Sequence, residues 1–272
     1  MNEIELIEHF EHIRYQIVGF EINTKSPLPT SVGSGFILEH NGEYIFVTAD
    51  HVANTHDNGV RILNKNICIQ TNRCKQDANG IWSVELVPLG GITFMSSYKV
   101  DIDKGIVSEQ PLFDAAFVVL NGSAKSACYV TLEINLNGAH VNCGDAKSRI
   151  TSDHIIEAKA EDIYSVFGRV QFKLEKSGNQ NLLLSTPMFH TNLKYICDQG
   201  DYYVLKYDKP VIVDEWKGLS GSPVINTDGE LIGIACSVDD IQNLVFVKKM
   251  KRVLTLIDAD ILTSQINKQN SI

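Results

Sequence analysis

Ser220 lies in the segment Gly218-Leu219-Ser220-Gly221-Ser222-Pro223, where small residues and a proline surround one hydroxyl. Such a segment can be a simple tight turn, or a bend that exposes the hydroxyl beside converging backbone N–H groups. A serine hydroxyl is a poor nucleophile at neutral pH and needs a neighbouring base, usually histidine. The base in turn needs a carboxylate that holds its tautomer. The candidate chemistry is therefore nucleophilic attack by Ser220, if a histidine and a carboxylate can reach it.

Two residues elsewhere in the chain could complete this chemistry. His51 follows the apolar run Tyr44-Ile45-Phe46-Val47 in the sequence TADHV, and the end of a strand is a rigid place for a catalytic group. Asp114 directly precedes a second apolar run, residues 115–120. A carboxylate beside a buried strand is costly to desolvate unless something pairs with it, and His51 could be that partner.

The elements that must position these groups are predicted to be mostly strands. Apolar runs flank Asn41-Gly42 and Asp228-Gly229, which predicts two hairpins. Further strands are expected at 84–89, 115–120, 202–205 and 244–247. Helical periodicity occurs only at the two ends, in residues 4–13 and 248–266. Many short strands with frequent turn signals favour a barrel or sandwich, while residues 121–209 are polar and weakly patterned.

The composition is typical of a globular protein and argues against nucleic-acid binding. Apolar residues form 44% of the 272 residues, and the net charge of −9 does not suggest the basic face that nucleic acid requires. No apolar run is long enough for a membrane span, and the acidic N-terminus lacks the apolar core of a signal peptide. The six cysteines show no CxxC pair or Cys/His cluster, so we expect free thiols and no metal site. We therefore expect a cytoplasmic protein.

Taken together, the three segments resemble the motifs of the chymotrypsin/trypsin-like serine peptidases. That family has T-A-x-H, D-[hydrophobic]-A-[hydrophobic] and G-x-S-G-[GS]-P, where this chain has TADH at His51, DAAF at Asp114 and GLSGSP at Ser220. The order histidine, aspartate, serine is that of chymotrypsin and differs from the order in α/β-hydrolases. The preceding Gly33-Ser34-Gly35-Phe36 is similar to the bacterial intracellular, high-temperature-requirement-like branch.

The resemblance implies an all-β fold of two antiparallel six-stranded barrels, with the site in the cleft between them. The first barrel would carry His51 and Asp114, and the second would carry Ser220. The implied boundaries are 1–16 for a short N-terminal helix, 17–120 for the first barrel, 121–129 for a linker, 130–247 for the second barrel, and 248–272 for a short C-terminal helix and tail.

The resemblance also implies a mechanism. Ser220 would attack a peptide carbonyl and form an acyl-enzyme, His51 would take and return the proton, and Asp114 would orient His51. The backbone N–H groups of Gly218 and Ser220 would form the oxyanion hole. No metal or cofactor is needed, and the partner would be a protein or peptide substrate. The sequence leaves open whether the oxyanion hole is formed at rest.

Leu219 and Val52 differ from the secreted members of that family. Leu219 stands where they have the aspartate that binds a newly cleaved N-terminal ammonium. Residues 17–20, Ile-Val-Gly-Phe, are similar to their activated N-terminus. Without that aspartate we predict that this segment is the first strand, so activation by N-terminal clipping is disfavoured. Val52 replaces a cysteine that follows their catalytic histidine, in agreement with a cytoplasmic location.

The substrate pocket gives two opposite indications. Asp214 lies six residues before Ser220, where trypsins have the aspartate that binds lysine or arginine, although it could equally be a solvated loop carboxylate. Cys236, Ser237 and Val238 correspond to the pocket wall of the family. Val238 in place of glycine would narrow the pocket and favour a small P1 residue, the residue before the cleaved bond. Cys236 also replaces a serine that usually supports the triad acid.

Three functions fit these features. The intact set of His51, Asp114 and Ser220 favours a regulated serine endopeptidase, held off until a substrate or an activating partner protein arrives. The alternatives are a non-catalytic binding module that keeps the barrels, and an esterase or other hydrolase with the same groups. High-temperature-requirement proteins continue into a PDZ domain, whereas this chain ends soon after the predicted second barrel. By analogy with bacterial intracellular relatives, we expect an effector in stress or phage defence.

Overall fold

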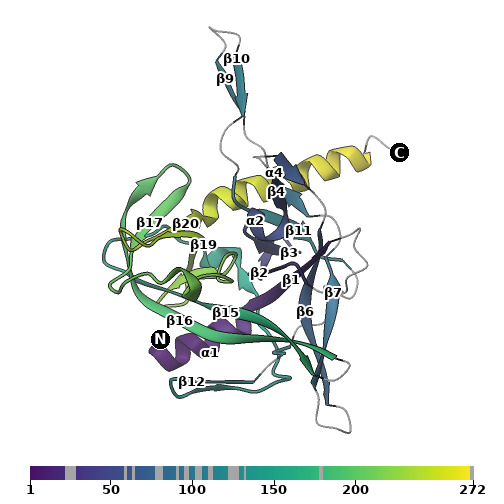
Figure 1. Cartoon of the computed structure of the whole chain (residues 1–272). Helices are drawn as coiled ribbons and strands as arrows, with labels where there is room; N and C mark the ends of the chain where they lie inside the picture. Colours follow the sequence, from purple (N-terminus) through teal and green to yellow (C-terminus); the bar gives the residue numbers. More distant parts are fainter. Residues whose placement is uncertain are drawn as a thin grey trace.

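The computed structural model shows two β-structures side by side, with one helix from each end of the chain packed against them (Figure 1). The C-terminal half forms the green and yellow barrel, and the N-terminal half forms the purple and blue sheet. The structure describes residues 1–21, 29–57, 60–62, 65–76, 82–89, 92–94, 98–101, 106–109, 113–121, 129–131, 133–177 and 180–269.

The C-terminal half is a closed barrel of six antiparallel strands. In pairing order these are β15 (Ile163–Ser177), β16 (Gln180–Gln199), β17 (Tyr202–Lys206), β20 (Leu244–Lys249), β19 (Leu231–Asp239) and β18 (Pro223–Asn226). Buried side chains such as Tyr164, Val166 and Val224 fill its interior. The predicted hairpin at Asp228-Gly229 joins β18 to β19. β15 and β16 are long strands within the weakly patterned residues 121–209, and neither was predicted.

The N-terminal half is one curved sheet of eight strands. Seven of them pair in the order β7 (Trp82–Pro88), β6 (Lys65–Gln76), β1 (Arg14–Glu21), β2 (Ser31–His40), β3 (Glu43–Thr48), β11 (Ala116–Val119) and β8 (Thr93–Phe94). The eighth, β14 (Ile150–Thr151), runs parallel to β2. Asn41 and Gly42 have φ values of 51° and 77°, so the predicted β2–β3 hairpin has the two positive φ angles of a type I′ turn.

The predicted all-β class with two barrel-like halves is confirmed. The second barrel closes with six strands as expected. The first differs, because in its described part the edge strands β7 and β8 do not pair with each other and the sheet stays a half-barrel. Residues 17–20 lie in β1, as predicted, and the closed barrel begins only at Ile163.

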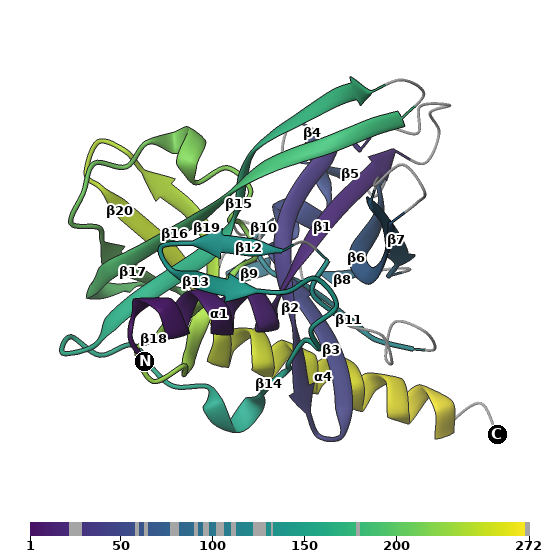
Figure 2. The same ribbon diagram turned by 90° about the horizontal axis from the view of Figure 1, so that it is seen from below.

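Within the described ranges, three short hairpins lie outside the two main sheets. They are β4 (Thr55–Asp57) with β5 (Val60–Ile62), β9 (Tyr98–Asp101) with β10 (Ile106–Glu109), and β12 (Ile134–Leu136) with β13 (Ala139–Val141). The β12–β13 hairpin lies beside the N-terminal helix (Figure 2). This hairpin and β14 belong to residues 130–247, yet they pack on α1 and on the first sheet.

Helices occur at both ends, as predicted. The longer ones are α1 (Glu3–Ile13) and α4 (Met250–Gln269), and α4 has 20 residues. The described part of the chain also has three short helical segments that were not predicted: α2 (Asp50–Ala53), η1 (Ser152–His154) and η2 (Val213–Glu215). No helix in the described ranges is long and apolar enough to cross a membrane.

One apolar core joins the two halves. Phe10 of α1 packs between Phe167 of β15 and Phe189 of β16, with ring centroids 6.1 and 6.2 Å apart. The same buried cluster includes Phe36 of β2 and Val253 of α4. Side chains from both halves therefore pack in one buried cluster. Four cysteines have described side chains, Cys68, Cys143, Cys197 and Cys236, and all four are free thiols, as expected.

Candidate active site

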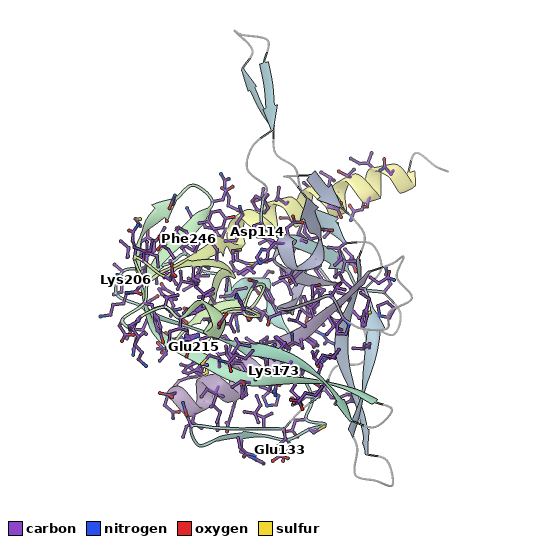
Figure 3. All side chains as sticks on the ribbon, in the orientation of Figure 1. Asp114, Glu133, Lys173, Lys206, Glu215 and Phe246 are labelled. Carbon is purple, nitrogen blue, oxygen red and sulfur yellow. The ribbon has the colours of Figure 1, made fainter. Side chains whose placement is uncertain are left out.

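His51 and Asp114 meet because their strands are neighbours. β3 and β11 pair antiparallel with Thr48 opposite Ala116, so the residues that follow β3 lie beside those that precede β11. His51 is in the short helix α2 after β3, and Asp114 directly precedes Ala115 and β11. Figure 3 labels Asp114 near the middle of the molecule, where the two halves meet. The sheet pairing thus joins two residues that are 63 positions apart.

The carboxylate of Asp114 holds the His51 ring. His51 Nδ1 lies 2.9 Å from both carboxylate oxygens, and the His51 backbone N–H donates to Oδ1 at 3.2 Å. Burial by itself would raise the pKa of Asp114, but the hydrogen bonds and charge of His51 hold that pKa below its ordinary value. The carboxylate is therefore ionised at neutral pH. With its Nδ1–H donated to Asp114, a neutral His51 ring has Nε2 as its acceptor.

The Ser220 segment is held against the end of β2. The Ser34 N–H donates to the Ser220 carbonyl at 2.9 Å, and the Gly221 N–H donates to the Ala235 carbonyl at 2.8 Å. A Cβ on Gly221 would lie 1.9 Å from the Ser34 carbonyl oxygen, and Gly221 has φ +87°. Glycine is therefore required after Ser220 by both the close approach and the backbone conformation.

The chain before Ser220 makes a turn in which two N–H groups have no acceptor among the described residues. The Leu219 N–H donates to the Trp216 carbonyl at 3.0 Å, and Gly218 has φ +112° whereas Lys217 is not among the residues with positive φ. These signs define a type II turn, in which the Lys217–Gly218 peptide is rotated by about 180° relative to type I. Neither the Gly218 nor the Ser220 N–H donates to another described residue. Both donors are thus available for a ligand oxygen.

Leu219 anchors this turn by apolar packing. Its side chain is 1% exposed and belongs to the core of the closed barrel together with Trp216. A Cβ on Gly168 of β15 would lie 2.6 Å from Leu219 Cδ2, so Leu219 fits into the space that this glycine leaves. At the position where the resemblance implies an aspartate, the chain therefore uses a buried leucine.

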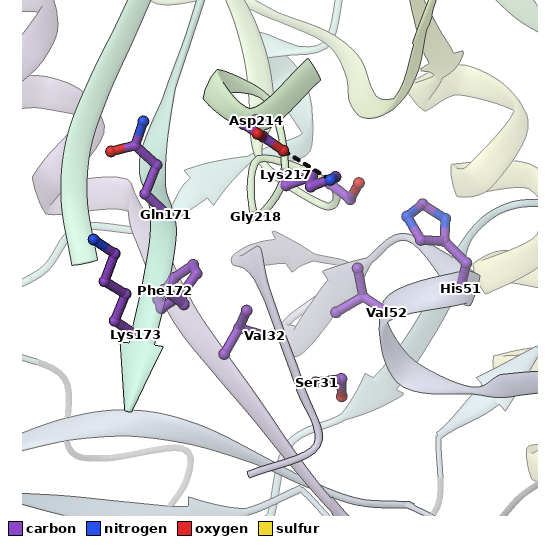
Figure 4. Close-up of a pocket in the computed structure, with 11 residues that line it drawn as sticks. Ser31, Val32, His51, Val52, Gln171, Phe172, Lys173, Asp214, Lys217 and Gly218 are labelled. Carbon is purple, nitrogen blue, oxygen red and sulfur yellow. Dashed lines mark hydrogen bonds and ion pairs between the residues drawn. The ribbon is translucent and has the colours of Figure 1, made fainter. Parts of the chain in front are cut away.

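His51 and Ser220 line one cleft between the two halves. The cleft has a volume of about 800 Å³, and its wall includes Val52 from the first half and Phe172, Lys217 and Gly218 from the second. In Figure 4 the His51 ring faces this space from the α2 side. Ser220 Oγ donates to the Cys236 carbonyl at 3.3 Å. The cleft is therefore lined by residues of both halves.

A second, smaller pocket lies on the barrel side of Ser220. Its volume is about 130 Å³, and it contains three of the four predicted pocket residues, Cys236, Ser237 and Val238. The rest of its wall is largely apolar and includes Val213, Trp216, Leu219 and Val245.

The fourth predicted pocket residue, Asp214, lines the large cleft instead. Asp214 accepts a hydrogen bond from Lys217 Nζ at 2.7 Å, with both side chains about 70% exposed, as the dashed line in Figure 4 shows. Among the residues that the structure describes, none that lines the small pocket carries a carboxylate.

The Cys236 thiol contacts the backbone of Asp114. Its Sγ lies 3.4 Å from the backbone carbonyl of Asp114, to which the thiol can donate. Burial and the charge of Asp114 raise the pKa of Cys236 well above its usual value, so the group stays a thiol. The sequence indicated this altered support, because Cys236 stands where the family has serine.

Sequence reasoning missed a cluster behind the Gly218 turn. His190 stacks on Trp216 with ring centroids 4.0 Å apart and an interplanar angle of 6°. Its Nδ1 lies 3.1 Å from the Tyr207 hydroxyl, and its Nε2 lies 3.1 Å from the Glu215 carbonyl. Burial lowers the pKa of His190 to about 4, so the ring is neutral at pH 7. No sequence motif marks His190, because it is an isolated histidine in a long strand.

The topology defines a trypsin-like two-barrel fold, with His51 and Asp114 on the first half and Ser220 on the second. No protein-family model matches the chain, and no curated protein matches it significantly. Among solved structures, the serine endoprotease from Yersinia pestis is similar at 13% identity and a TM-score of 0.45. That match covers 95% of this chain but only 66% of the Yersinia protein's length. The fold assignment rests on the strand topology described above.

Proposed function

We propose that this protein is a serine endopeptidase with Ser220 as nucleophile, His51 as base and Asp114 as the acid that orients it. One observation carries the proposal. His51, whose ring is hydrogen-bonded to Asp114, lines the same cleft as Gly218 and Ser220, and the backbone N–H groups of Gly218 and Ser220 donate to no other described residue. These are the parts that acyl transfer requires.

In the proposed reaction, Ser220 Oγ leaves the Cys236 carbonyl and turns to His51. His51 Nε2 takes its proton as Oγ attacks the substrate carbonyl, and the carbonyl oxygen receives the N–H groups of Gly218 and Ser220. Asp114 stabilises the imidazolium that forms. His51 then protonates the leaving amine, and the same groups activate a water molecule to release the acyl group. The type II turn supports an oxyanion hole that is formed at rest.

For the substrate, we propose a protein or peptide chain with a small apolar P1 side chain. The pocket of about 130 Å³ beside Ser220 supports this choice, because Val213, Val238 and Val245 restrict it and give it apolar walls. A basic P1 residue would bring a charge into this pocket without a carboxylate, since Asp214 is outside and paired with Lys217. A cytoplasmic location, an activating partner and a role in stress or phage defence stay predictions.

The first test is labelling with a fluorophosphonate probe, which reacts with activated serines. We expect labelling of the wild type and none of Ser220→Ala or His51→Ala, with Ser222→Ala as the matched control that keeps labelling. A library of peptide and ester substrates would follow. Cleavage of esters alone would favour the alternative hydrolase, and a folded wild type that does not label would contradict the proposal and favour a binding module.

A further inference from the structure

A buried chain of polar groups leads from the N-terminal helix to the Gly218 turn. Glu11 of α1 and Arg14 of β1 are each 2% exposed, and Arg14 Nη2 lies 3.5 Å from Glu11 Oε2. Arg14 Nη1 donates to Ser34 Oγ at 3.2 Å. Ser34 Oγ in turn donates to the Gly218 carbonyl at 3.0 Å. These contacts connect α1, β1 and β2 of the first half to the loop that carries the nucleophile.

The chemistry of these groups fixes the direction of the last hydrogen bond. A guanidinium has only donors, so Ser34 Oγ must act as acceptor towards Arg14. The single Ser34 proton is then left for the Gly218 carbonyl. Arg14 itself is held by the Glu11 carboxylate and by Gln16 Oε1 at 3.2 Å. Arg14, held by Glu11, thus sets the orientation of the Ser34 hydroxyl, which is completely buried.

This hydrogen bond acts on the peptide that directly follows Gly218. The Gly218–Leu219 peptide is held at both ends, since its carbonyl accepts from Ser34 and its N–H donates to Trp216. Conversion to a type I turn would change the φ of Gly218 from +112° to about −90° and reverse the Lys217–Gly218 peptide. The Gly218 N–H would then leave the cleft. The following Gly218–Leu219 peptide has the same orientation in both turn types, so the Ser34 hydrogen bond acts by fixing the position of Gly218 in the cleft wall.

We propose that Ser34 and Arg14 are positioning residues for the oxyanion hole. Arg14 orients the Ser34 hydroxyl, and Ser34 holds the Gly218 carbonyl so that the Gly218 N–H stays directed at the substrate. This inference rests on the proposed function. It also explains how the turn is ordered with Leu219 in place of an aspartate. The polar contact that holds the turn comes from Ser34 in the first half of the molecule.

The test compares Ser34→Ala with Ser165→Ala. Both variants lose one buried serine hydroxyl, but Ser165 Oγ donates to Thr191 Oγ1 at 2.9 Å and does not contact the turn. We expect Ser34→Ala to raise hydrogen exchange at the Leu219 amide about tenfold and to lower the fluorophosphonate reaction rate and kcat by about tenfold or more, with KM within about twofold. Ser165→Ala should change none of these by more than about twofold.

Arg14→Lys is the second variant. Lysine keeps a cation opposite Glu11, but its single ammonium cannot span Glu11, Gln16 and Ser34. We expect changes in the same direction as for Ser34→Ala, of about threefold.

Three outcomes separate the claims. Leu219 exchange that is equal in Ser34→Ala and Ser165→Ala would overturn the inference even if the wild type were inactive. If the wild type reacts, raised Leu219 exchange in Ser34→Ala together with an unchanged fluorophosphonate reaction rate would also overturn the inference. An unreactive wild type with raised exchange in Ser34→Ala would refute the proposed function while supporting the anchor.

Discussion

His190 gives the protein a stability that depends on pH. The ring is 2% exposed and neutral in the folded protein, because burial lowers its pKa from 6.5 to about 4. The neighbouring Lys209 also lowers this pKa, and the Glu215 carbonyl raises it in part. Between pH 6.5 and 4 the unfolded chain therefore binds more protons at this histidine than the folded protein does. The free energy of unfolding must then fall as the pH falls through this window.

The magnitude follows from the two pKa values. A difference of one proton changes the free energy of unfolding by about 1.4 kcal/mol per pH unit. Over the window from pH 6.5 to about 4, His190 alone should reduce the stability by about 3 kcal/mol. The pKa of Asp114 is lowered from 3.8, so its contribution is lost only below this window.

Urea unfolding at a series of pH values measures this effect, with His190→Gln as the partner variant. Glutamine does not titrate, yet it can still donate to the Glu215 carbonyl and accept from Tyr207. Burial also lowers the pKa of His9, but both proteins keep His9, so the difference between them isolates His190. We expect the wild type to lose about 3 kcal/mol more than the variant between pH 6.5 and 4. Parallel stability curves would refute the reasoning.

Three further predictions concern the site. Asp114→Asn should lower the rate of serine acylation at pH 7 by about 10⁴-fold, because an amide cannot hold the His51 tautomer; a fall of less than tenfold would contradict this. Val238→Gly should raise kcat/KM for P1 leucine relative to P1 alanine by about tenfold to a hundredfold in a fluorogenic peptide series, whereas an unchanged ratio would place the P1 pocket elsewhere. Leu219→Ala should reduce the unfolding free energy by about 2–5 kcal/mol in urea, since it leaves a cavity beside Gly168, and a loss below about 1 kcal/mol would show that the turn is anchored by other contacts.

The sequence predicted features that depend on local backbone demands. Asn41-Gly42 marks a turn because both residues adopt positive φ, and Gly221 marks the Ser220 bend because a Cβ would strike β2. The alternation of short apolar runs and turns predicted the all-β class, which the strand pairing confirms. His51, Asp114 and Ser220 could be selected from the sequence because each lies beside an apolar run or a glycine-rich turn. Their catalytic roles stay a prediction.

The tertiary structure decided what depends on contacts between distant segments. Asp214 lies outside the small pocket because of the path of η2 and its ion pair with Lys217. No local sequence pattern encodes the direction in which the Asp214 side chain points. The contacts from Arg14 through Ser34 to Gly218 join three segments that are far apart in sequence, and a buried arginine has no signature of its own. The long strands β15 and β16 were missed because their burial does not alternate along the sequence. Residues 164–170 are all buried, whereas Leu174, Leu184 and Ile196 are exposed, so the strands show no period-2 pattern.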